Sequence, residues 1–149
     1  MPKNLIARLT RNRNARLRKE PTTNPTFTQA RERLYQEVLK KPQDAWLISG
    51  LAILDALLNN KETAISEAKR AVDLLPISKD ARDGPNFLAS LAMVYAWTGE
   101  VDQAFSTLGQ LTKIPFGVYY GGLKCDSDWE PLRQDPRYDK LLAELAPKD

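Results

Sequence analysis

Apolar residues from Phe27 onward recur at spacings of three and four residues, and no stretch shows the apolar–polar alternation of a β-strand. This pattern predicts helices, and prolines or glycines near the ends of the apolar runs predict where those helices stop. We therefore expect an all-α fold. The predicted helices cover residues 28–40, 43–58, 61–75, 86–97 and 101–113, followed by short helices near 129–133 and over 136–145.

Local signals refine these boundaries. Gly99 follows the fourth predicted helix, at the position where a left-handed residue commonly ends a helix. Asp135 and Pro136 suit the N-cap and the first position of the last helix. The segment after the fifth predicted helix contains Gly121 and Gly122, and we expect it to be irregular, with a flexible turn at these two glycines.

The helical pattern repeats along the chain. Small or apolar residues four apart on one predicted helix, followed by a proline, recur 34 residues later. The first copy is Ala30, Leu34, Val38 and Pro42, and the second is Ala64, Ala68, Val72 and Pro76. The third copy begins at Ala104, 40 residues after Ala64, and continues with Leu108, Leu111 and Pro115, with six residues inserted in the loop over 77–85. Asn59 and Gly99 each precede a copy by five residues, and both residue types tolerate a left-handed turn.

Together these features resemble the tetratricopeptide-repeat family over residues 28–116. The resemblance implies a short right-handed superhelix of antiparallel helix hairpins, in which small residues let neighbouring helices approach closely. Asp55 departs from the family pattern, because the repeat usually has a tyrosine at this position.

A narrower resemblance extends to the C-terminus. The DGP loop over 83–85, the GE turn at 99–100 and the sequence WEPLRQDPRYDKLL over 129–142 are similar to the C-terminal region of large bacterial regulators. In those proteins such repeats follow a protein kinase, a nucleotide cyclase or a winged-helix domain, so the resemblance implies an interaction or sensory module. We expect a C-terminal helical cap from about residue 117, in which Trp129, Leu132, Tyr138 and Leu141 cover the apolar edge of the last helix pair.

Composition narrows the chemistry. The chain has 149 residues, 42% hydrophobic and 28% charged, as in an ordinary globular domain. It has no histidine and one cysteine, Cys125, which excludes histidine-based triads, histidine zinc sites and an internal disulfide. Asp126, Asp128 and Glu130 alternate as calcium ligands do, but a proline and a leucine follow where a calcium loop needs a glycine and a distant glutamate. We expect no enzyme, no cofactor and no metal site.

Charge divides the chain into two parts. The first 20 residues carry seven basic side chains and one acidic, whereas the remainder carries 15 basic and 18 acidic side chains. We predict a poorly ordered basic arm and linker over 1–26 and one helical domain over 27–149. An alternative is that the arm binds nucleic-acid phosphates. Its arginines are Arg8, Arg11, Arg13, Arg16 and Arg18.

In tetratricopeptide repeats, the first helix of each unit lines the concave face. The register set by the prolines places nine mostly apolar residues on this face, almost without charge. Such a groove fits an amphipathic helix or an extended hydrophobic peptide. The alternative is that these side chains pack against one another, against the cap or against a twin subunit. The nine are Trp46, Ser49, Ile53, Ala56, Asn86, Ala89, Met93, Ala96 and Trp97.

The leading functional hypothesis is a non-catalytic protein–protein interaction or scaffold module that binds a partner peptide or helix in this groove. The alternatives left open are a nucleic-acid-associated protein that uses the basic arm, a detached fragment of a larger bacterial regulator, and a homodimer. No secretory signal or membrane-spanning stretch is visible in the sequence, so we expect a cytoplasmic protein without membrane association.

Overall fold

The computed structural model describes residues 25–147. These residues form helices without any strand, which confirms the all-α prediction for this part of the chain. The elements are α2 (Pro25–Lys40), α3 (Ala45–Leu57), α4 (Lys61–Leu74), α5 (Gly84–Trp97), α6 (Val101–Leu111), α7 (Tyr120–Cys125), the 3-10 helix η2 (Ser127–Leu132) and α8 (Pro136–Leu145).

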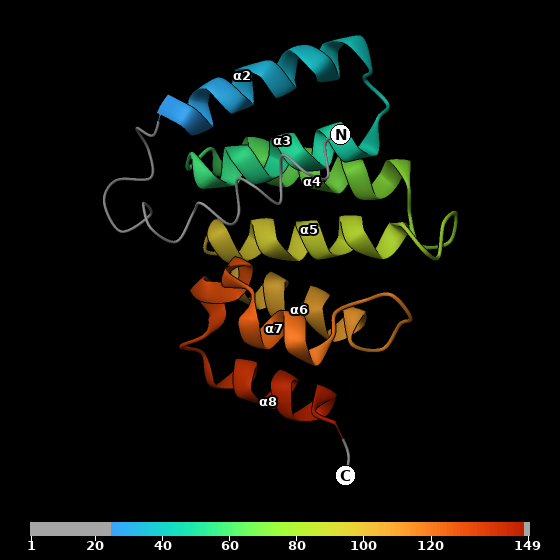
Figure 1. Ribbon diagram of the computed structural model, residues 1–149, viewed down its shortest axis with the longest axis vertical. Coiled ribbons are helices and arrows are strands. Elements are labelled where there is room, and N and C mark those ends of the chain that lie inside the picture. Colours follow the sequence, from blue (N-terminus) through green and yellow to red (C-terminus); the bar gives the residue numbers. More distant parts are fainter. Residues whose placement is uncertain (1–24, 148–149) are drawn as a thin grey trace.

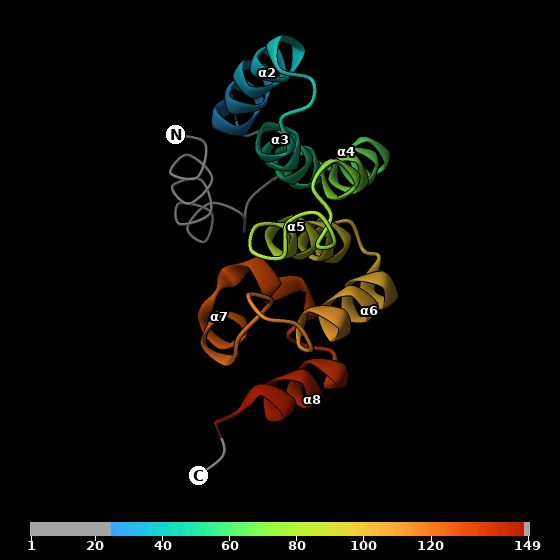
Figure 2. The same cartoon turned by 90° about the vertical axis from the view of Figure 1, so that its right-hand side faces the viewer.

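The helices follow one another as a stack, with α2 and α8 at its two ends (Figure 1). Each of α2 to α5 packs against the helix that follows it in the chain, and α3 also packs against α5. Figure 2 shows that α3, α5 and α7 lie along one side, whereas α4 and α6 lie along the other. The chain thus forms two layers of helices, and α3 and α5 are neighbours in one of them.

The observed helix boundaries differ from the predicted ones by a few residues. Asp44 caps α3 by accepting hydrogen bonds from the backbone N–H groups of Trp46 (3.0 Å) and Leu47 (3.2 Å), so this helix starts two residues later than predicted. Helix α2 starts three residues earlier than predicted, at Pro25, because proline suits the first turn of a helix. The last helix has the predicted bounds, and Asp135 is its N-cap as predicted.

The turns of the two helix hairpins, α3–α4 and α5–α6, are built in the same way. Asn59 and Gly99 have φ angles of 64° and 82°, which confirms the left-handed conformation expected at both positions. After each of them, a backbone N–H reaches back to a carbonyl five residues earlier, from Asn60 to Asp55 and from Glu100 to Tyr95, at 2.8 Å in both cases. The two turns therefore share one backbone conformation.

Small residues lie where the helices approach one another. Ala52, Ala64, Ala92 and Ala104 have 0% exposed surface, and Ala68 has 1%. The four 0% alanines form two pairs 40 residues apart, Ala52 with Ala92 and Ala64 with Ala104, so each hairpin has the same small contacts at its centre. A larger side chain at such a point would push the helices apart.

One prediction for the C-terminal part is wrong. Gly121 and Gly122 were expected in a flexible turn, but both lie in α7. Their weak helix propensity is outweighed by tertiary contacts, because Leu123 is fully buried and its carbonyl accepts a hydrogen bond of 2.6 Å from the Tyr138 hydroxyl. The ring of Tyr119 lies 3.2 Å from the place where a Cβ would stand on Gly122, so the missing side chain makes room for that ring.

The end of the stack near α8 is closed by apolar side chains. Trp129, Leu132, Tyr138 and Leu141 are buried, as predicted. The 3-10 helix η2 packs against α5, and α8 packs against α6 and α7. These contacts cover the last helix pair with the C-terminal segment.

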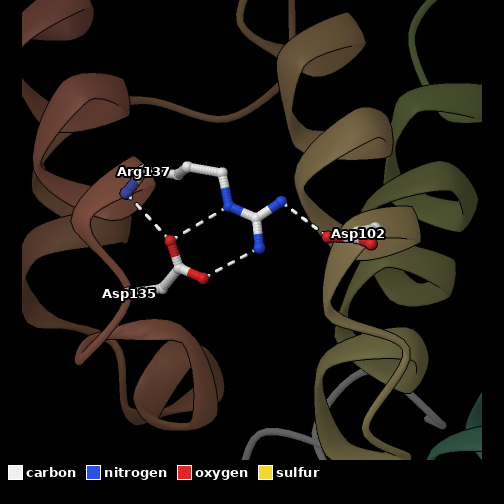
Figure 3. A network of polar contacts seen from close by, with 3 residues as sticks. All are labelled: Asp102, Asp135 and Arg137. Atoms are coloured by element: carbon white, nitrogen blue, oxygen red, sulfur yellow. Dashed lines mark hydrogen bonds and ion pairs between the residues drawn. The ribbon is translucent and has the colours of Figure 1, made fainter.

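A polar network on the surface joins α8 to α6 (Figure 3). Arg137 donates hydrogen bonds to Asp102 at 2.7 Å and to both carboxylate oxygens of Asp135, at 3.0 and 2.8 Å. Its guanidinium lies 4.4 Å from the centre of the Phe105 ring. The side-chain and backbone hydrogen bonds from Arg137 lower the pKa of Asp135 to about 2. Because solvent screens this network, the buried apolar side chains contribute more to holding α8 in place.

We predict that Ala92→Leu lowers the free energy of unfolding by about 1–3 kcal/mol, because the added carbons must fit where no surface is exposed. Ala89→Leu is the matched control, since Ala89 lies on the same helix and is only partly buried. Chemical denaturation followed by circular dichroism measures both values. Equal stability of the two variants would contradict the close helix contact at position 92.

A second prediction compares two glycines. A Cβ on Gly117 would stand 1.9 Å from the Leu111 carbonyl oxygen, whereas a Cβ on Gly109 in α6 meets nothing within 4 Å. Gly117→Ala should therefore lower the free energy of unfolding by more than about 2 kcal/mol. Gly109→Ala should raise it by about 0.5–1 kcal/mol, because alanine favours a helix interior over glycine. Thermal unfolding of both variants checks the opposite signs.

Candidate interaction face

The neighbouring helices α3 and α5 are almost free of charge. Helix α5 contains no Asp, Glu, Lys or Arg, and the one charged residue of α3 is Asp55, which is fully buried. The helices α2, α4 and α6 carry acidic residues, and α2 and α4 also carry basic ones. The side of the stack formed by α3 and α5 is therefore apolar and uncharged compared with its surroundings.

The nine residues predicted for a groove divide by burial. Asn86 is exposed, and Trp46, Ala89 and Trp97 are partly buried. The other five are buried in the core, and they are Ser49, Ile53, Ala56, Met93 and Ala96. The structure therefore uses five of the nine residues for helix packing. It leaves the surface of this face to Trp46, Asn86, Ala89 and Trp97, which we call the α3–α5 face.

Trp46 stands at the beginning of the face, in the first turn of α3. Its ring contacts that of Phe87, with centroids 4.7 Å apart and planes tilted by 59°. Phe87 is buried in the first turn of α5. A tilted aromatic pair of this kind holds the starts of the two helices together.

Trp97 stands at the other end of the face, as the last residue of α5. Its indole N–H donates a hydrogen bond of 2.9 Å to the backbone carbonyl of Asp128 in η2. Because α3 and α5 run in the same direction (Figure 1), Trp46 and Trp97 lie at opposite ends of this face. The C-terminal segment therefore holds one of the two tryptophans, and the α3–α5 contact holds the other.

A polar cluster lies inside the first hairpin. Asp55 Oδ1 accepts hydrogen bonds from Arg31 Nε on α2 at 2.7 Å and from Asn60 Nδ2 in the α3–α4 turn at 2.6 Å. The Arg31 side chain is 26% exposed, whereas that of Asp55 is fully buried. The hydrogen bond and the charge of Asp55 raise the pKa of Arg31, which keeps the guanidinium charged. This ion pair neutralises the one charge of α3.

Glu67 of α4 completes the polar cluster. Oδ2 of Asp55 and Oε2 of Glu67 are both buried and lack an N–H donor among the described residues. Burial, together with the charge of Asp55 and a hydrogen bond to it, raises the pKa of Glu67 to about 8. Burial and the neighbouring Asp55 thus favour the protonated carboxyl of Glu67.

Sequence reasoning identified one member of this cluster. Asp55 was recognised as a departure from the repeat, but Arg31, Asn60 and Glu67 were not assigned a role. A comparison of the two hairpins could have revealed the cluster, because Tyr95 and Thr107 stand 40 residues after Asp55 and Glu67. Asp55 and Glu67 are carboxylic acids where the second hairpin has a tyrosine and a threonine, and this difference indicates a polar cluster in the first hairpin.

The other candidate residues lie outside the described part of the chain or on its surface. The arginines of the basic arm, Arg8, Arg11, Arg13, Arg16 and Arg18, lie outside the described residues. Asp126 and Glu130 are exposed, and among residues 25–147 no group of three or more His, Cys, Asp or Glu side chains is close enough to hold a metal ion. Cys125 is exposed at the end of α7. No helix within the described range is long and apolar enough to cross a membrane.

Comparison with known proteins gives no further assignment: no family model, no curated protein and no solved structure matches the chain.

We predict that Asp55→Ala lowers the free energy of unfolding by about 2–4 kcal/mol, because it leaves the Arg31 guanidinium and the Asn60 amide without their acceptor. The expected loss lies below the largest values for broken buried pairs, since Arg31 is partly exposed. Asp73→Ala is the control, because Asp73 is an exposed carboxylate of α4 and its removal should change stability by less than about 0.5 kcal/mol. Urea denaturation at neutral pH measures both variants, and a loss as small as that of the control would contradict the role of Asp55.

Proposed function

We propose that the chain is a non-catalytic protein-interaction module that binds an apolar segment of a partner protein along the α3–α5 face. The observation that carries this proposal is the absence of exposed charge on two neighbouring helices that form one side of the stack. Trp46 and Trp97 stay partly exposed on this uncharged face, and large apolar side chains at the surface are typical of a site that a partner covers.

The same proposal includes a tetratricopeptide-like arrangement of the helices. It is supported by the two hairpins with matching left-handed turns, by the buried alanines 40 residues apart and by the division into two layers. In that architecture α3 and α5 are the inner helices of successive units, and the hairpins continue as a short right-handed superhelix with the C-terminal segment as its cap. The inner helices are then the ones that meet a ligand.

The chemistry of the face defines the partner. Trp46 and Trp97 supply large aromatic surfaces at the two ends, and Asn86 supplies one exposed amide between uncharged neighbours. The face has no cation to hold a partner carboxylate. The partner is therefore expected to be an amphipathic helix or an extended peptide whose contacting side is apolar.

The test is selection of peptides from a displayed random library, followed by titration of a synthesised peptide with tryptophan fluorescence. The selected peptides should share an apolar side, and Trp46→Ala should weaken their binding by about 2 kcal/mol or more. Trp97→Ala should also weaken binding. Both changes should reduce stability, because Trp97 loses its hydrogen bond to Asp128 and Trp46 loses its ring contact with Phe87.

Leu39→Ala is the matched control for binding. Leu39 is an exposed apolar residue of α2, which is outside the α3–α5 face, so this change should leave peptide affinity unaltered. The free energy of unfolding is measured for each variant alongside its affinity. Selected peptides that bind the Trp46 and Leu39 variants equally well would overturn the proposed face.

A further inference from the structure

An acidic segment borders one end of the α3–α5 face. The 3-10 helix η2 packs against α5, and the indole N–H of Trp97, the last residue of α5, donates to the backbone carbonyl of Asp128 at 2.9 Å. The segment from the C-cap of α7 through η2 carries three acidic side chains, which are Asp126, Asp128 and Glu130. One basic side chain follows them, Arg133, which pairs with Glu130 at 3.4 Å. Acid therefore exceeds base at the Trp97 end of the face.

The chain itself contains a segment that complements both the apolar face and its acidic end. The first 20 residues, the basic arm, precede α2 and lie outside the described residues. They carry seven basic side chains and one acidic. Leu5, Ile6 and Leu9 recur at spacings of three and four residues, the pattern of one apolar side of a helix. The arm therefore combines apolar residues with an excess of positive charge.

We propose that the basic arm occupies the α3–α5 face of its own chain, where a partner segment must displace it. The apolar residues of the arm cover the partly exposed Trp46 and Ala89, and the arginines that follow lie beside the acidic side chains near Trp97. This inference rests on the proposed function, because it adds an internal competitor for the same face.

The position of the start of α2 favours this contact. Figure 1 shows that α2 and α5 run in opposite directions, so α2 begins at the end of the stack where α5 ends with Trp97. Figure 2 shows this start on the side along which α3 and α5 lie. The 24 residues before Pro25 span about 80 Å when extended, whereas the 14 residues of α5 measure about 21 Å. The arm is therefore long enough for the whole face, and its basic residues come nearest the acidic end.

Other exposed apolar side chains of the described residues fit a basic segment less well. The ring centre of Tyr35 on α2 lies 5.7 Å from the guanidinium of Arg31, and Phe116 follows Lys113 by three residues. A segment rich in arginine meets like charge at both places. Helices α3 and α5 carry no exposed charge, so the α3–α5 face itself does not repel the arm.

Attachment to the same chain also favours the arm over a free ligand. A short flexible linker holds a tethered segment at an effective concentration on the order of 1 mM. A contact with a dissociation constant of about 1 mM is then about half occupied, and the apparent affinity of a free peptide falls in proportion to the uncovered fraction. A contact that is weak between separate molecules therefore regulates access to the face.

The first experiment places a nitroxide spin label on Cys125 of the full chain. Cys125 is the one cysteine of the sequence and is exposed. Its Cα lies at most about 11 Å from that of Asp128, three residues later, so the label stands at the acidic end of the face. The amide NMR signals of residues 11–18 should lose intensity compared with the chain whose label is reduced, and dilution should not restore them. Full intensity would overturn the proposal, and so would a loss that dilution removes, because the arm of a second copy would then be the ligand.

The apolar part of the contact is tested by Leu5→Ser combined with Leu9→Ser. These changes remove two apolar side chains and leave the charge unaltered, so a peptide selected on the face should bind at least about twofold more tightly. Asn4→Ser combined with Thr10→Ser is the matched control in the same stretch, and it should leave the affinity unchanged. Equal affinities for the two double variants would show that the arm does not compete for the face.

The ionic part of the contact is tested on the helical domain. Asp126→Asn combined with Glu130→Gln removes two exposed carboxylates from the acidic segment, so residues 11–18 should regain part of their signal in the labelled chain. Asp139→Asn combined with Glu144→Gln removes the same charge from exposed positions of α8 and should leave the signal loss unchanged. The same signal loss in both double variants would contradict the charge complementarity from which the arm is inferred.

These experiments separate the failure of this inference from the failure of the proposed function. If selected peptides bind the α3–α5 face while residues 11–18 keep their full signal, the arm is not the occupant and the proposed function stands. If the label on Cys125 reduces the arm signals but no apolar peptide binds the face, the arm contact stands and the proposed binding of a partner is wrong.

Discussion

The burial of α3 is the constraint on which the rest of the structure depends. This helix is apolar on nearly every side, so it must be covered by α2, α4 and α5 at once. Its one charged residue, Asp55, lies among these contacts and is fully buried. The neighbours of α3 therefore have to supply both apolar area and a counter-charge. Leu34 and Val38 of α2 contribute buried apolar side chains, and Arg31 of the same helix contributes the counter-charge.

The two hairpins share a turn conformation but differ in their buried chemistry. In the second hairpin, buried Tyr95 and Thr107 take the places of Asp55 and Glu67, and neither requires a counter-charge from another helix. That hairpin is completed instead by the C-terminal segment, which buries Trp129 and Leu132 and binds the Trp97 indole. The two ends of the stack are thus closed in different ways, by apolar side chains and a buried ion pair at one end and by apolar packing with an indole hydrogen bond at the other.

The sequence predicts the features that depend on local spacing. The left-handed turns at Asn59 and Gly99, the buried alanines and the cap at Asp135 follow from residue type and period, because each is decided within one or two turns of chain. Helix α7 could not be predicted in this way, since Leu123 and the Tyr138 hydroxyl stabilise it against the low propensity of its two glycines. The partners of Asp55 also lie on other helices, and periodicity carries no information on which charged residue meets it. The groove prediction could not say which of its residues on α3 and α5 reach the surface, because burial by neighbouring helices divides them between core and surface.

The position of α3 between two different environments limits how binding data can be interpreted. One side of this helix presents Trp46 toward α5, and the other presents Asp55 toward α2 and α4. A change in the polar cluster that loosens α2 also removes support from the helix that carries Trp46. Loss of peptide binding in such a variant would therefore report on the placement of α3 rather than on a contact with the peptide. Only changes that alter affinity while the free energy of unfolding and the protection of the α2 amides from hydrogen exchange stay constant identify residues that touch the partner, because those two quantities measure the support that α3 receives.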